Sequence, residues 1–86
     1  MKVKKLIDIL NKQNPEDEVI LSKDSEGNSF SPLADFSEDL YVPETKWYGE
    51  IHIKKLTDKL KEQGFSEEDL YGGDDGINCI TLWPVN

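Results

Sequence analysis

The sequence feature that most restricts the possible folds is the segment of residues 77–84, which places apolar side chains in both of its alternating registers. One register contains Ile77, Cys79, Thr81 and Trp83, and the other contains Asn78, Ile80, Leu82 and Pro84. A strand with one face in water alternates apolar and polar residues, whereas a strand covered on both faces does not have to. The pattern therefore predicts a central strand that is covered on both faces.

The N-terminal segment has the apolar spacing of a helix. Apolar residues follow one another at i, i+3, i+4 and i+7, namely Val3, Leu6, Ile7 and Leu10. This spacing predicts a helix over about residues 2–13 with one apolar stripe. Asn14-Pro15 ends it, because a residue before proline is disfavoured in the helical conformation.

A second helical stripe is formed by Ile53, Leu56 and Leu60, which predicts a helix over about residues 52–63. Gly64 suits the position just past its C-terminus, with Phe65 folding back on Leu60 as in a Schellman motif. Ser66 is followed three residues later by Asp69, a pattern typical of a capping box that starts a helical turn over 67–71.

Residues 18–23 and 29–36 have strand character and are separated by turn-forming residues, so they predict a β-hairpin. Pro32 has no amide hydrogen to donate, which indicates an edge strand or a bulge. A further short strand over 40–42 is indicated before Pro43, but residues 37–50 have no clear periodicity.

These elements together predict an α+β fold. We expect a small antiparallel sheet of three or four strands with two main helices packed on one face, in the order α-β-β-(β)-α-β. The helix over 2–13 would bury its stripe against a sheet that contains Val19, Leu21, Ile80 and Leu82. At 86 residues, we expect the chain to form a single domain, 1–86, with a small core.

The chain is acidic, with 18 acidic residues against 10 lysines and a net charge of −8. Most of the excess lies in residues 24–50 and 62–86, which we expect to form an anionic lobe. This charge argues against direct binding of nucleic acid, which usually needs a basic face. A single cysteine excludes an internal disulfide and favours a reducing cytoplasm, and the sequence has no apolar run that could span a membrane.

The residues that could carry out chemistry are few. Zinc needs three or four ligands, but His52 and Cys79 are the only imidazole and thiol. Asp74 and Asp75 lack the ligand spacing of a calcium loop. We expect Cys79 to be a buried, inert thiol and His52 to lie at the surface or partly packed. No nucleophile elbow or phosphate-binding loop is present, so we predict no catalytic site, no cofactor and no metal.

The aromatic residues allow two interpretations. Two or three of them could complete a core that is short of large aliphatic residues. Alternatively, Trp47 and Tyr48, beside the helix breaker Gly49, form an exposed anchor for a protein partner. Carboxylates in the anionic lobe, including Asp74 and Asp75, would then favour a partner with a basic surface. The competing interpretation of the acidic charge is that it only keeps the protein soluble.

Three segments resemble one group of small uncharacterised proteins of bacteriophages and prophages. They are residues 18–33 (EVILSKDSEGNSFSPL), residues 41–44 (YVPE) and residues 82–86 (LWPVN), and the preceding helix (KKLIDILNKQNPEDEV) is similar to the start of that group. Together these cover about half the chain. The resemblance implies a phage or prophage origin and an intracellular life in an infected or lysogenic bacterium, and it supplies no functional residues.

We therefore expect a non-enzymatic protein that binds and modulates a host protein, as a monomer or homodimer in the host cytoplasm. A DNA-mimic inhibitor of a host defence nuclease is a special case, because carboxylates can take the place of phosphates. The alternative class is a structural or assembly accessory of the virion.

Overall fold

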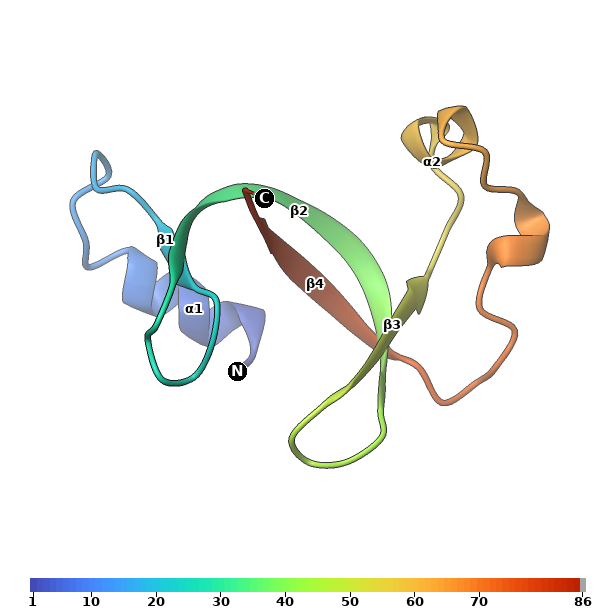
Figure 1. Ribbon diagram of the computed structural model, residues 1–86, viewed down its shortest axis with the longest axis horizontal. Coiled ribbons are helices and arrows are strands. Elements are labelled where there is room, and N and C mark those ends of the chain that lie inside the picture. Colours follow the sequence, from blue (N-terminus) through green and yellow to red (C-terminus); the bar gives the residue numbers. More distant parts are fainter. Residues whose placement is uncertain (86) are drawn as a thin grey trace. The chain divides into compact units, whose positions relative to one another are not determined.

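A computed structural model describes residues 1–85 (Figure 1). The elements in chain order are α1 (Val3–Leu10), β1 (Ile20–Ser22), β2 (Phe30–Pro43), β3 (Gly49–Ile53), α2 (Asp58–Glu62), the 3-10 turn η1 (Glu67–Asp69) and β4 (Ile77–Pro84). The four strands form a small sheet in which β1, β3 and β4 all pair with β2. The predicted α+β class with a small antiparallel sheet is confirmed.

The chain forms two compact units. Unit 1 contains residues 1–33 together with the C-terminal residues from Pro84, and unit 2 contains residues 34–83. The long strand β2 and the last strand β4 both continue from one unit into the other. None of the helices within residues 1–85 is long and apolar enough to cross a membrane.

Unit 1 contains the predicted hairpin. β1 pairs antiparallel with the start of β2, with Ile20 opposite Pro32 and Ser22 opposite Phe30. Asp24 closes the turn between them, because its carboxylate accepts from the backbone amides of Asn28 and Glu26 at 3.1 and 2.9 Å. These hydrogen bonds, led by that from Asn28, lower the pKa of Asp24. The hairpin prediction over 18–36 is confirmed, and it follows from local turn chemistry.

Three of the four residues in the apolar stripe of α1 are exposed, in contrast to the burial that its periodicity predicts, and Leu6 is half-buried. Val3, Ile7 and Leu10 keep 56%, 50% and 47% of their surface, and no hydrophobic residue within 1–85 is fully buried. The reason is local to unit 1, where the paired part of the sheet is only three residues long on each strand. So short a ladder offers too little surface to cover one side of a helix.

In unit 2, the strand β3 extends into the segment for which the sequence predicts the start of a helix. Residues 49–53 form β3, which pairs antiparallel with β2 from Gly49 opposite Pro43 to Ile53 opposite Asp39. The predicted helix over 52–63 is therefore wrong in its first half. α2 begins only at Asp58, because Thr57 has an extended backbone and its hydroxyl accepts from the amide of Leu60 at 3.2 Å, which caps the helix there.

The end of α2 follows the prediction. Gly64 adopts φ +97°, a conformation that glycine tolerates without strain. The amide of Phe65 donates to Leu60 O and that of Gly64 to Lys61 O, both at 3.1 Å, which is the Schellman pattern. The Asp69 carboxylate then accepts from the amide of Ser66 at 2.8 Å, so Ser66 caps the predicted helical turn, which runs from Glu67 but ends at Asp69 rather than at residue 71.

The predicted central position of the last strand is wrong. Among the described residues, β4 pairs with β2 alone, and β2 is the strand with neighbours on both sides. This also corrects the first alternative for the strand that contains Pro32, an edge position, whereas the second alternative, a bulge, stays a prediction. At 14 residues, β2 is long enough to pair with β1, β3 and β4 along different parts of its two edges.

Candidate functional site

The loop that joins β2 to β3 is held by hydrogen bonds at both ends. The amides of Glu44 and Thr45 donate to Tyr48 O at 3.1 and 3.0 Å. The Thr45 hydroxyl accepts from the amides of Trp47 and Tyr48 at 3.0 and 3.2 Å. The loop therefore has a defined conformation that is set by its own residues, and it can be followed between β2 and β3 in Figure 1.

Two aromatic side chains project from this loop. Trp47 is 82% exposed and Tyr48 is 59% exposed. The ammonium of Lys46 lies 5.2 Å from the centre of the Trp47 ring, within the range of a cation–π interaction. The alternative that Trp47 completes a core is inconsistent with this exposure. Burying an aromatic side chain of this size on binding is a typical source of affinity at protein interfaces.

Asp74 and Asp75 lie in the loop between η1 and β4. The Tyr71 hydroxyl donates to the Asp75 carboxylate, which raises the pKa of Tyr71. The Tyr71 ring also stacks on His52 of β3, with centroids 4.5 Å apart. Asp75 thus holds a ring that covers part of the sheet, whereas no hydrogen bond of Asp74 is seen within residues 1–85. Among residues 1–85, no hydrogen bond joins this pair to Trp47 or Tyr48.

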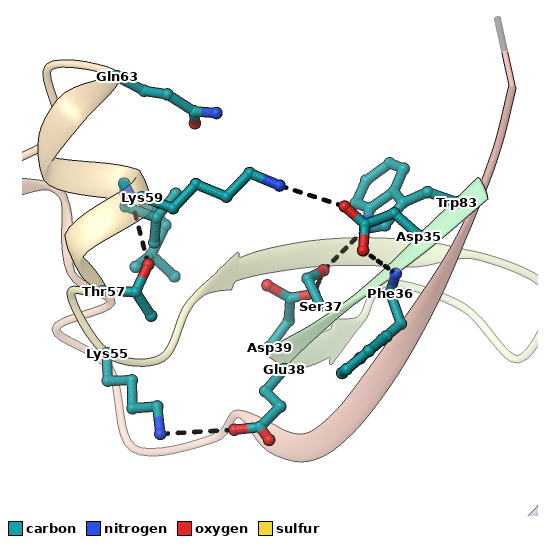
Figure 2. Close-up of a pocket in the computed structure, with 12 residues that line it drawn as sticks. Asp35, Phe36, Ser37, Glu38, Asp39, Lys55, Thr57, Lys59, Gln63 and Trp83 are labelled. Carbon is teal, nitrogen blue, oxygen red and sulfur yellow. Dashed lines mark hydrogen bonds and ion pairs between the residues drawn. The ribbon is translucent and has the colours of Figure 1, made fainter.

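Unit 2 also contains a cavity of about 710 Å³ that the sequence did not indicate. It lies between α2 and residues 35–39 of β2, with Ile53, Leu60 and Trp83 among its apolar lining (Figure 2). Two ion pairs reach across its rim. Lys59 contacts Asp35 at 3.2 Å, and Lys55 contacts Glu38 at 3.6 Å. Because all four side chains are more than half exposed, these pairs add little to stability.

A chain of hydrogen bonds runs along one wall of this cavity. The Trp83 indole donates to the Ser37 hydroxyl at 2.8 Å, which in turn donates to the Asp39 carboxylate at 2.5 Å. The Thr81 hydroxyl donates to the same carboxylate oxygen at 2.7 Å. Asp39 therefore joins β2 to β4 through their side chains. Ser37 and Asp39 share one register of β2, a signal that is visible only once residues 37–43 are known to be a strand.

Asp35 provides a pH-dependent contact. The amide of Phe36 lowers its pKa most and the ion pair with Lys59 adds to this, so we expect an NMR titration to place the pKa of Asp35 below 3.8. A lowered pKa means that the contact is fully formed above 3.8 and is lost as the pH falls through the folded-state pKa. Lys59→Met should move the pKa back only part of the way. A full return to 3.8 would contradict the leading role of Phe36.

The remaining groups that the sequence singled out are dispersed. His52 lies in β3 rather than at a helix start, 3.7 Å from Glu50, and Cys79 is half-buried rather than fully buried. Residues 1–85 contain no group of three His, Cys, Asp or Glu side chains placed to hold a metal. The loop with Trp47 and the cavity beside Asp39 are two features of unit 2 with a defined geometry.

Comparison with known proteins adds nothing to this description, because the chain matches no family model, no curated protein and no solved structure.

Proposed function

We propose that the chain is a non-enzymatic acidic protein of phage or prophage origin that binds and modulates a host protein with a basic surface. The observation that carries this proposal is Trp47, which is 82% exposed on a loop held by its own hydrogen bonds. The resemblance in residues 18–33, 41–44 and 82–86 supports the origin, and with it a place of action in the cytoplasm of the bacterial host.

The ordered loop favours binding because little conformational entropy remains to be lost. Thr45 already caps the amides of Trp47 and Tyr48, so both rings are presented from a backbone that needs no rearrangement. Preorganisation of this kind raises affinity by lowering the cost of association. A pocket on the partner that takes up the indole would bury most of its surface.

The charge of the chain supports a basic partner. Glu44 of the loop and Glu50 of β3 flank Trp47 in the sequence, and the net charge of −8 attracts a cationic surface over a distance set by the salt concentration. Association would therefore be steered by long-range attraction and then completed by burial of the aromatic rings. Asp74 and Asp75 add to the negative electrostatic potential that attracts such a partner.

We expect Trp47→Ala to weaken binding of the host partner about tenfold or more, which corresponds to about 1.4 kcal/mol. The matched control is Phe30→Ala, because Phe30 is a 63% exposed aromatic residue of unit 1. The partner is first captured from a bacterial host lysate with the immobilised wild-type chain. Its affinity for each purified variant is then measured by biolayer interferometry at 0.05 and 0.5 M salt.

The proposal is supported if Trp47→Ala loses affinity, Phe30→Ala does not, and association slows at high salt. Equal binding by both variants would exclude the loop as the anchor. A captured partner that is a defence nuclease displaced by duplex DNA would identify the DNA-mimic case. Recovery of the chain with purified virions alone would instead favour the assembly role and contradict the proposal.

A further inference from the structure

The strand β4 has one edge without a partner. Among the described residues its only neighbour is β2, and Val85 just beyond it donates to Pro32 O of β2 at 3.3 Å. Amide groups alternate in direction along an antiparallel strand. Because the amide of Val85 points toward β2, alternation along the strand directs the amides of Asn78, Ile80 and Leu82 away from β2, toward the open edge.

This edge lacks the features that normally keep a strand from pairing with another chain. Natural edge strands are short, charged, bulged or covered. β4 has eight residues, and residues 76–85 form an uncharged run in an otherwise acidic chain. The only protective residue in the strand is Pro84 at its end. Ile80 and Leu82 share one face of the strand and remain 44% and 37% exposed.

The other open edges of the sheet are better protected. β1 has three residues and is followed by Lys23. β3 contains Glu50, and its last carbonyl, that of Ile53, already accepts from the amide of Tyr71 at 3.2 Å. β4 is therefore the edge on which an additional strand can form a full ladder of hydrogen bonds.

We propose that β4 pairs antiparallel with β4 of a second copy of this chain, about a two-fold axis at Ile80. In this register Ile80 lies opposite Ile80 of the second copy, and Asn78 lies opposite Leu82. Each of the three outward amides then finds a carbonyl acceptor. The two exposed Ile80 side chains contact each other at the axis, and each Leu82 lies opposite Asn78 and diagonal to Ile80 of the second copy.

The strand that pairs with the open edge of β4 is β4 of a second copy, because this uncharged segment is complementary to itself. Two chains of −8 repel each other, so they can associate closely only through a segment that brings no carboxylates together. The uncharged β4 meets this condition, and the two-fold arrangement is self-complementary, as most homodimer interfaces are. The two copies are therefore held together by main-chain hydrogen bonds between the β4 strands and by contacts between aliphatic side chains.

The first test is the mass of the full chain in solution by light scattering after gel filtration. We expect the wild-type chain to have twice its mass of 9.8 kDa and Ile80→Lys to have the single-chain mass, because two lysines would meet at the axis. The matched control Ile20→Lys places the same charge on a similarly exposed residue of β1, 52% exposed, and should remain a dimer. A wild-type chain that remains a monomer at millimolar concentration overturns the proposal.

The second test uses the wild-type chain alone, so it does not depend on the folding of a variant. In the dimer, the amide of Ile80 should exchange its hydrogen at least tenfold more slowly than in a sample diluted into the monomer range. The amide of Thr81 points toward β2, so its exchange should change much less. Fast exchange at Ile80 in a sample of twice the chain mass would show that the dimer uses another surface, and would overturn the proposal.

Discussion

Gly49→Ala is expected to lower the free energy of unfolding by about 3 kcal/mol, at the upper end of the usual cost of overpacking. Gly49 begins β3 directly opposite Pro43. A Cβ atom at this position would overlap the Val42 carbonyl oxygen and lie 2.7 Å from Pro43 Cα and 2.9 Å from the Tyr41 ring. Backbone atoms cannot rotate out of the way, so the hairpin must open to accommodate the methyl group.

Gly72→Ala is the matched control for this substitution. Nothing lies within 4 Å of a Cβ atom at Gly72, and its φ is not positive. Alanine there should be neutral or stabilise the fold by about 0.5 kcal/mol, because it restricts the unfolded chain. Urea unfolding of both variants at one protein concentration measures the difference. Equal stability of the two variants would show that the close approach at Gly49 relaxes without cost.

Asp39→Ala is expected to cost about 2 kcal/mol, the usual size of the loss when hydrogen bonds to a charged group are removed. Its carboxylate accepts from the hydroxyls of Ser37 and Thr81, and Ser37 also holds the Trp83 indole. Removal of the carboxylate leaves both hydroxyls without this acceptor and loosens the connection between β2 and β4. Asp39→Asn keeps one acceptor oxygen and should lose less.

Glu38→Ala is the control for Asp39, because Glu38 is the adjacent residue and makes only an exposed ion pair with Lys55 at 3.6 Å. Its loss should change the free energy of unfolding by less than about 0.5 kcal/mol. Urea unfolding followed by tryptophan fluorescence reports both stability and the environment of Trp83. If Asp39→Ala and Glu38→Ala are equally stable, the hydrogen-bond chain contributes nothing that water does not supply.

The features that the sequence predicted are those held by interactions between residues close together in the chain. Three features depend on residues at most five positions apart: the hairpin around Asp24, the C-terminus of α2 at Gly64 and the turn η1 capped by Ser66. Such features are specified locally, so the sequence is sufficient to predict them. The sequence leaves the exposure of Trp47 open between a core role and an exposed anchor, and only the structure decided it.

The errors concern elements whose state depends on distant partners. Ile53 fits a helical stripe with Leu56 and Leu60, but it also alternates with Ile51. Pairing with β2 selects the strand, because the ladder from Gly49 to Ile53 supplies hydrogen bonds that a helix start there would not. The cavity beside Asp39 was missed for the same reason, since β2, β4 and α2 each contribute to its lining.

The sequence by itself determined the class of fold, the hairpin and the C-terminal end of α2, because short-range hydrogen bonds and glycine and proline geometry act within a few residues. Only the tertiary structure decided that β2 is the central strand and β4 an edge strand. The apolar residues in both registers of β4 are compatible with either position. Which of its edges is occupied depends on the 14-residue length of β2, more than 30 residues away in the chain.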